Sequence, residues 1–183
     1  MVDREQLRDW VREQHAGQLI KYTDNPYFEH LEYVAEKAEN KALLAYEIGL
    51  CHDLFEETKI SAGQLMVVLT SFGYGEAEVV HITDSVTELT DKFTKKAYPN
   101  LSKIERKRRE AERLIHISPD AQTVKYGDLI YNINWVLQYE STRKKEKYLR
   151  KKQALLGKMT KGDPGLRYEA LELIRQAENV NSV

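Results

Sequence analysis

An almost wholly apolar run, residues 42–51, ends directly in a histidine and an aspartate, and this junction most constrains the fold. Its composition predicts a central helix that is buried on most sides and leads into His52 and Asp53. A second fragment, Lys-Tyr-Gly-Asp-Leu-Ile-Tyr-Asn at residues 125–132, also places charged groups inside an apolar helical stretch. Because a buried, unpaired charge is costly, such groups are usually paired with one another or bound to a metal ion.

Helical periodicity extends over most of the chain. Apolar residues recur at helical spacing in the windows 31–38, 79–89 and 129–137. Ser61 with Gln64, and Ser102 with Glu105, form capping-box patterns at two helix starts, and Pro119 is expected to stop the second of these helices. A basic helix is expected over residues 143–159 and a last helix after the break at 161–164. No convincing pair of strands is present, so the sequence predicts an all-α fold.

Composition fits one compact domain of ordinary size. The 183 residues are 42% hydrophobic and 31% charged, which predicts a single domain over 1–183 with a site-bearing core at about 15–150 and C-terminal helices at about 143–180. The single cysteine, Cys51, excludes an internal disulfide and a cysteine-cluster zinc site. The net charge of -1 offers no global attraction for nucleic acid, so nucleic acid is not an expected partner. With no membrane span or signal peptide apparent, we expect a cytoplasmic protein of unspecified oligomeric state.

Four side chains are candidate metal ligands: His30, His52, Asp53 and Asp128. Two imidazoles and two carboxylates without a thiolate suit a borderline or hard divalent ion. Four protein ligands around tetrahedral zinc would make a closed, structural site, whereas a six-coordinate ion keeps positions open for water and phosphate. The donor set therefore favours Mn²⁺, with Fe²⁺, Co²⁺ and Zn²⁺ left open.

Further polar residues accompany these ligands at helical spacing. If the helix continues past His52, Glu56 and Glu57 lie one turn beyond the ligands and can orient or deprotonate the attacking water. Lys125 and Asn132 flank Asp128 on one helix face, where the ammonium group offsets phosphate charge. Each of these residues alone has an ordinary structural explanation, such as a packed histidine or a solvated acidic face. Their combination in this order favours the metal site.

Seven motifs in order resemble those of one family, the hydrolase domain of RelA/SpoT proteins, and in particular the small alarmone hydrolases called metazoan SpoT homologues. They are His-Ala-Gly-Gln-Leu-Ile-Lys at 15–21, Pro-Tyr-Phe-Glu-His at 26–30, Cys-His-Asp-Leu-Phe-Glu-Glu-Thr at 51–58, Val-Thr-Glu-Leu-Thr at 86–90, Leu-Ser-Lys-Ile-Glu-Arg-Lys-Arg at 101–108, His-Ile-Ser-Pro at 116–119 and the segment 124–132. The similarity covers about residues 15–148.

The resemblance implies an all-helical HD-domain phosphohydrolase fold. It also implies Mn²⁺-dependent removal of the 3′-pyrophosphate from guanosine tetra- or pentaphosphate, a small nucleotide substrate. Carried over by motif, the four candidate ligands hold the metal, Glu56 and Glu57 are catalytic, and Asn132 lies near the metal and the ribose. Lys21, Lys103 and Tyr148 match substrate-contacting positions. The remaining basic residues at 103–113 and 143–152 are interpreted as solvated helix faces, and Trp135 as core or pocket-edge packing.

The chain departs from the family pattern mainly where the base is expected. Ile20 replaces an arginine that stacks on or clamps the base in relatives, and Glu57 replaces an aspartate. The choice between a guanosine and an adenosine substrate therefore stays open. Two alternatives also remain: another HD-superfamily phosphohydrolase acting on nucleoside mono- or triphosphates or on the phosphate of NADPH, and a non-catalytic module that senses a nucleotide or binds a partner.

Overall fold

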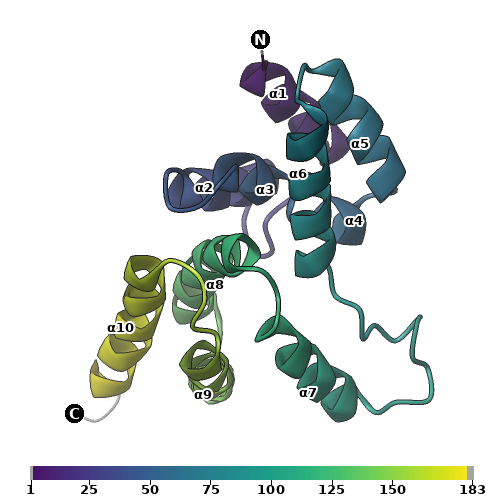
Figure 1. Cartoon of the computed structure of the whole chain (residues 1–183). Helices are drawn as coiled ribbons and strands as arrows, with labels where there is room; N and C mark the ends of the chain where they lie inside the picture. The colour runs from purple at the N-terminus through teal and green to yellow at the C-terminus, as the bar shows by residue number, and fades with distance from the viewer. Residues whose placement is uncertain (1, 181–183) are drawn as a thin grey trace.

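The computed structural model describes residues 2–180, whose regular structure is entirely helical (Figure 1). The ten α-helices in this range are α1 (Arg4–Gln14), α2 (Phe28–Ala38), α3 (Ala45–Cys51), α4 (Leu54–Glu57), α5 (Ala62–Ser71), α6 (Glu76–Leu89), α7 (Lys103–Leu114), α8 (Pro119–Tyr139), α9 (Thr142–Lys158) and α10 (Pro164–Val180). One isolated antiparallel bridge joins Leu19 to Pro26. None of the helices in the described range combines the length and apolarity needed to cross a membrane. The prediction of an all-α fold is confirmed.

The predicted helix starts are largely confirmed. Ser61 and Gln64 form the reciprocal capping box at the start of α5. Ser102 accepts the Glu105 backbone N–H at 3.1 Å, but the Glu105 carboxylate pairs with arginines of α7 instead of returning to the cap. The expected role of Pro119 is wrong: α7 ends at Leu114, and Pro119 is the first residue of α8. Proline suits that position, since its missing N–H would have no partner within the helix.

The apolar run 42–51 becomes helical only from Ala45. Leu44 adopts a left-handed backbone conformation with φ of 53°, and the Leu43 side chain is 65% exposed. The chain must turn back between α2 and α3, and this turn takes up the first residues of the run. From Ala45 onward the prediction of a buried central helix is confirmed, because Ile48, Leu50 and Cys51 are fully buried.

Three helices, α2, α3 and α8, pack against one another at the centre of the molecule (Figure 1). A Cβ atom on Gly49 of α3 would lie 2.6 Å from Ala35 Cα of α2, so the two backbones are in close approach. A Cβ atom on Gly127 of α8 would lie 3.5 Å from the Val34 carbonyl oxygen of α2. Small residues at these crossings bring the three helices together, and with them the polar residues that each helix carries.

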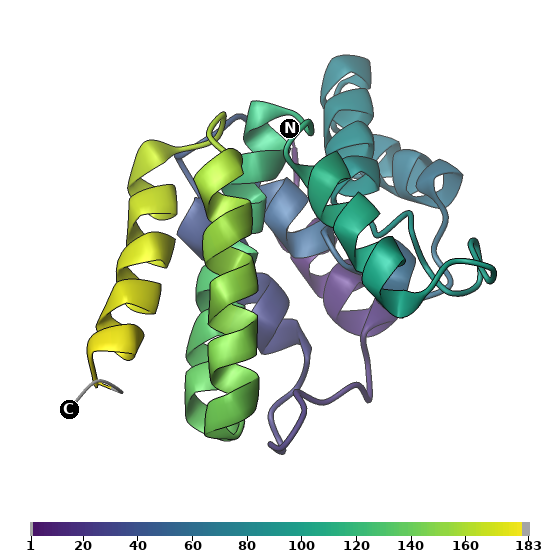
Figure 2. The ribbon, with the colours of Figure 1, turned by 90° about the horizontal axis from the view of Figure 1, so that it is seen from below.

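The other helices surround this centre. The α1 helix is tied to α3 by Arg4, whose Nε lies 2.7 Å from a carboxylate oxygen of the buried Glu47. Helices α5 and α6 pack against each other on one side, while α9 and α10 flank α8 on the other (Figure 2). A long connection, residues 90–102, leads from α6 to α7.

The close approach of α2 and α3 predicts that Gly49→Ala is destabilising. The added methyl group meets backbone atoms that cannot move independently, so we expect a loss of about 1–3 kcal/mol in the free energy of unfolding, measured by urea denaturation. The matched control is Gly63→Ala in α5, where a Cβ atom has open space and alanine is expected to be neutral or to stabilise the helix by up to about 1 kcal/mol. Equal effects of the two substitutions would contradict this packing argument.

Candidate metal centre

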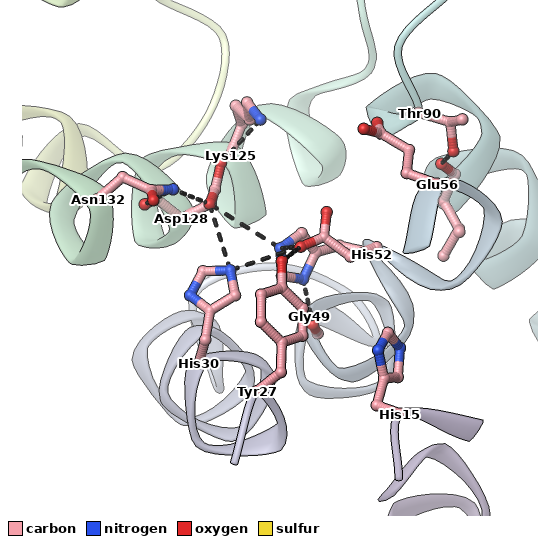
Figure 3. A network of polar contacts seen from close by, with 12 residues as sticks. His15, Tyr27, His30, Gly49, His52, Glu56, Thr90, Lys125, Asp128 and Asn132 are labelled. Atoms are coloured by element: carbon pink, nitrogen blue, oxygen red, sulfur yellow. Dashed lines mark hydrogen bonds and ion pairs between the residues drawn. The ribbon is translucent and has the colours of Figure 1, made fainter. Parts of the chain in front are cut away.

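The four candidate ligands, from three separate segments, converge in the structure (Figure 3). His30 Nε2, on α2, lies 3.6 Å from Asp53 Oδ2 and 3.6 Å from Asp128 Oδ1. His52 Nε2, just after α3, lies 3.2 Å from Asp53 Oδ2 and 3.9 Å from Asp128 Oδ1. The two histidines and Asp128 are buried, and Asp53 is partly exposed.

The backbone of α3 fixes the orientation of the His52 ring. His52 Nδ1 lies 2.7 Å from the Gly49 carbonyl oxygen, which can only accept a hydrogen bond, so Nδ1 carries a proton. In the neutral ring, Nε2 then presents a lone pair to the cluster. This Nε2 is buried and has no hydrogen-bond partner. A carbonyl contact of this kind is the usual second interaction of a metal-binding histidine.

A break in the helix places Asp53 in the cluster. The prediction of one helical strip through residues 52–57 is wrong, since α3 ends at Cys51 and α4 begins at Leu54. Asp53 lies between them with φ of -103° and ψ of 3°. This turn allows adjacent residues, His52 and Asp53, to face the same point, which consecutive residues of a regular helix do not do.

Two neighbours on α8 hold the carboxylate of Asp128. Lys125 Nζ lies 2.7 Å from Oδ2, and Asn132 Nδ2 donates to Oδ1 at 2.5 Å (Figure 3). Lys125 and Asn132, which the sequence places three residues before and four residues after Asp128, therefore both contact its carboxylate. Oδ1 is the oxygen that faces the two imidazoles, so Asn132 contacts the same atom as the proposed ion.

Electrostatics show that the cluster favours positive charge. Burial acts to lower the pKa of His52, but Asp53 and Asp128 outweigh it and raise the pKa to about 9. Burial acts to raise the pKa of Asp53, yet His52 and His30 bring it well below its usual range. For Lys125, the charge of Asp128 likewise overcomes burial and raises the pKa. Two carboxylates in one small buried volume thus stabilise any cation placed beside them.

The donor set fits a divalent cation. Nitrogen and oxygen ligands about 2.1 Å from a common ion are separated by about 3–4 Å, the range seen between these imidazole and carboxylate atoms. His30, His52 and Asp53 each offer a ligand atom within 4.8 Å of the others. The partnerless Nε2 of His52 is also explained if an ion is its partner.

Glu56 is held near the cluster by the long connection between α6 and α7. Its Oε1 accepts the Asp91 backbone N–H at 2.6 Å. The connection is in turn fixed by Glu110, which accepts the N–H groups of Lys92 and Phe93 at 2.9 Å each. Partial burial of the Glu56 carboxyl group raises its pKa to about 7, although much of the side chain is exposed. A carboxyl group with this pKa is suited to take up a proton near neutral pH.

The remaining predicted residues lie in several places. Glu57 is exposed, and its carboxylate makes no hydrogen bond or ion pair within residues 2–180. Tyr148 of α9 is half-buried, and the charges of Asp128 and Lys125 both act on its hydroxyl group. Lys103 is exposed at the start of α7. The Lys21 side chain lies over the rings of Tyr22 and Trp135, with its Nζ 4.4 and 5.8 Å from the ring centroids.

Sequence reasoning missed two residues at this site. Tyr27 donates its hydroxyl hydrogen to Asp53 Oδ2 at 2.5 Å, and its ring lies 5.4 Å from that of His30. The only signal in the sequence was its spacing of three from His30. Lys152 of α9 lies over the Tyr148 ring at 5.2 Å, and burial together with the charge of Lys125 lowers its pKa to about 8. The sequence did not single out this lysine because it lies in a run of basic residues that was interpreted as a solvated helix face.

Comparison with known proteins agrees with these motifs. A mouse protein named guanosine-3′,5′-bis(diphosphate) 3′-pyrophosphohydrolase MESH1 is 27% identical over 173 residues, covering 92% of this chain and 88% of the relative. The human protein of the same name is 30% identical over 130 residues, covering 68% and 64%. The chain is similar to SpoT-like hydrolases of the HD type. The resemblance seen in the seven motifs is thereby confirmed.

A solved structure supports the fold of this family. It is described as a metazoan orthologue of SpoT that hydrolyses ppGpp and plays a role in starvation responses. It superposes with a TM-score of 0.75 at 20% identity, covering 94% of this chain and 93% of that one. No family model matches the chain.

The Tyr27 hydroxyl group predicts a measurable effect on metal affinity. Tyr27→Phe removes the hydrogen bond that orients Asp53 Oδ2, so we expect Mn²⁺ affinity, measured by calorimetry, to fall about tenfold. Tyr33→Phe is the matched control, because the Tyr33 ring packs on Tyr131 and its hydroxyl group makes no hydrogen bond within the described residues. Unchanged affinity in Tyr27→Phe, or an equal loss in the control, would contradict the role given to this hydroxyl.

Proposed function

We propose that the chain is a divalent-metal-dependent hydrolase that removes the 3′-pyrophosphate from nucleotides of the guanosine 3′,5′-bis(diphosphate) type. The observation that carries this proposal is the convergence of two imidazoles and two carboxylates beside a glutamate with a pKa near 7. The names of the MESH1 relatives support the substrate class. The roles of individual residues below belong to the same proposal.

The reaction needs a nucleophile, a stabilised phosphoryl group and a leaving group. A water oxygen attacks the phosphorus bonded to the 3′ oxygen, the bond from phosphorus to that oxygen breaks, and pyrophosphate and a 3′-hydroxyl result. His30, His52, Asp53 and Asp128 would hold a divalent ion, which would supply positive charge to neutralise phosphate oxygens and would make water more acidic. Glu56 accepts the proton that the attacking water loses, and Glu57 assists in orienting that water. The leaving 3′ oxygen takes up a proton from solvent to become the hydroxyl group.

Residues of α8 and α9 match the substrate's other requirements. Asn132 Nδ2 donates to both the carboxylate and the backbone carbonyl oxygen of Asp128, which leaves the amide oxygen to accept from a ribose hydroxyl. Lys125 and Lys152 provide ammonium groups beside the cluster, where burial and the charge of Lys125 lower the pKa of Lys152. A substrate phosphate between the two ammonium groups would offset this repulsion. Tyr148 and Lys103 would contact the phosphate groups that do not react. A nucleotide carrying several phosphates suits this arrangement.

Manganese is the ion we propose for this site. The proposed ligands are two nitrogens and two oxygens with no sulfur, and a six-coordinate ion held by them would leave positions for water and phosphate. Zinc, iron and cobalt accept the same ligand types, so ion identity is tested by reconstitution. Activity restored by Mn²⁺ and not by Mg²⁺ after treatment with a chelator would support the proposal, since Mg²⁺ binds imidazole poorly.

The central prediction concerns the product. Purified protein with Mn²⁺ is expected to convert guanosine 3′,5′-bis(diphosphate) to guanosine diphosphate and pyrophosphate, both measured by anion-exchange chromatography. Asp53→Ala removes a ligand and is expected to lower kcat at least about 100-fold. Asp84→Ala, an exposed aspartate on α6, is the matched control and should keep wild-type activity.

The products also separate the alternatives. Orthophosphate or tripolyphosphate from nucleoside mono- or triphosphates, or orthophosphate from NADPH, would assign another HD-type reaction. Tight nucleotide binding with no product for any 3′-pyrophosphorylated nucleotide would favour a sensing module and would falsify the enzymatic proposal.

The raised pKa of Glu56 predicts the acidic limb of the pH–rate profile. Glu56 acts as a base in its ionised form, so activity is lost as pH falls through its pKa of about 7, to about a tenth of the plateau one pH unit below. A bound cation lowers this pKa, and the midpoint of the limb is therefore expected at or below about pH 7. Glu56→Gln should lower kcat at least about 100-fold and abolish the limb. An unchanged limb in this variant would assign the base elsewhere.

A further inference from the structure

An aromatic cluster at the later part of α8 has no role in the steps above. Tyr22 and Trp135 stack with ring centroids 5.6 Å apart and an interplanar angle of 10°. The Tyr139 ring lies 5.6 Å from that of Trp135 and 6.3 Å from that of Tyr22. Tyr22 is 57% exposed, so its ring is accessible to a ligand. We name Tyr22, Trp135 and Tyr139 the aromatic platform.

The platform is aligned with the metal centre along α8. Asp128, Asn132, Trp135 and Tyr139 follow one another at intervals of four, three and four residues, which places them on one face of the helix. Seven residues separate Asp128 from Trp135, a rise of about 10 Å along the helix axis. A phosphate at the metal, a sugar at Asn132 and a base at the platform would therefore lie in sequence along this face.

The backbone holds Tyr22 in a conformation that tyrosine rarely adopts. The Thr23 N–H donates to the Ile20 carbonyl oxygen at 3.0 Å and closes a turn in which Tyr22 has a φ of 68°. Glycine or asparagine normally occupies such a position. Backbone geometry of this kind persists only where surrounding contacts hold it in place.

Hydrogen bonds and charge fix the platform in place. Trp135 Nε1 donates to the Lys21 carbonyl oxygen at 3.1 Å, which ties the turn to α8. Lys21 Nζ lies over the Tyr22 ring and 4.0 Å from Glu140, so its charge remains beside the rings. Ile20 is only 7% exposed and is not available to a ligand. The rings, and not Ile20, thus form the surface that an aromatic ligand can reach.

We propose that the aromatic platform binds the nucleobase of the substrate by stacking. This rests on the proposed function and deepens it, because it assigns base recognition to this chain's own residues. Stacking on an aromatic ring tolerates any base. The dissociation constants for matched guanine and adenine nucleotides should therefore differ by less than about tenfold.

Fluorescence of Trp135 tests the platform without requiring catalysis. Trp10→Phe leaves Trp135 as the single tryptophan, and a chelator prevents turnover. Guanosine 3′,5′-bis(diphosphate) and its adenine counterpart are expected to quench this fluorescence, while inorganic pyrophosphate, which has no base, is not. Equal quenching by pyrophosphate would overturn the proposal.

Tyr22→Asn is the variant that separates binding from folding. Asparagine tolerates the left-handed backbone conformation, so the thermal unfolding midpoint should be unchanged or higher. The dissociation constant of both nucleotides should rise about tenfold through the loss of one stacking partner. With Mn²⁺ present, KM should rise by a similar factor while kcat stays within about twofold, because the base lies away from the reacting atoms. Tyr168→Ala, an exposed tyrosine on α10, is the control and should change neither constant.

The outcomes distinguish this proposal from the enzymatic one. Nucleotide-dependent quenching that Tyr22→Asn weakens, in a protein that hydrolyses nothing, would support the platform and refute the proposed activity. Hydrolysis with KM and dissociation constants unaffected by Tyr22→Asn would support the activity and overturn the platform.

Discussion

Two carboxylates that face the same buried imidazole nitrogens are the constraint on which the rest of the structure depends. Asp53 Oδ2 and Asp128 Oδ1 each lie within 4 Å of both His30 Nε2 and His52 Nε2. Buried carboxylates elsewhere are paired differently: Glu47 has the guanidinium of Arg4, and Glu110 has that of Arg113. At the cluster, Lys125 balances only one of the two aspartates. The arrangement is satisfied when a cation lies among the four atoms, and the same two carboxylates raise the pKa of His52.

This cluster and the helix packing depend on each other. The ligands come from α2, the end of α3, the turn after it and α8, so they meet only when these helices pack in their observed order. The close crossing at Gly49 sets the distance between the two histidine-bearing segments. A metal ion that binds all four side chains binds the folded chain alone, and its binding energy therefore adds to the stability of the fold. A bound metal ion would in this way stabilise the helix packing that brings its ligands together.

Features that depend on local sequence pattern could be predicted from the sequence. Features that depend on contacts between distant parts of the chain were missed. Periodicity and capping residues gave the helices of the core and the correct start of α5. The break at Asp53 was missed because nothing local forbids helix there; contacts with Tyr27 and His52 favour the turn. Lys152 was treated as one of many solvated lysines, since its burial depends on neighbouring helices. The metal ligands, by contrast, could be proposed from sequence because histidine and aspartate in apolar helical surroundings need partners. Their roles in catalysis remain predictions.

The face of α8 that carries Asp128, Asn132, Trp135 and Tyr139 explains how chemistry and recognition can change independently in this chain. Asp128 and Asn132 form the end of this face that lies at the metal centre, and Trp135 and Tyr139 form the other end. About one to three helical turns separate the residues of the two ends, so a substitution at the far end leaves the ligand geometry intact. Loss of the family arginine at position 20 would leave a guanine without its planar cation, but Tyr22 next to it supplies an aromatic plane instead. A stacking surface gives affinity with little discrimination between bases, whereas hydrogen bonds to base edges give both. The proposed function and the proposed platform together predict selectivity that is determined more by the 3′-pyrophosphate than by the base.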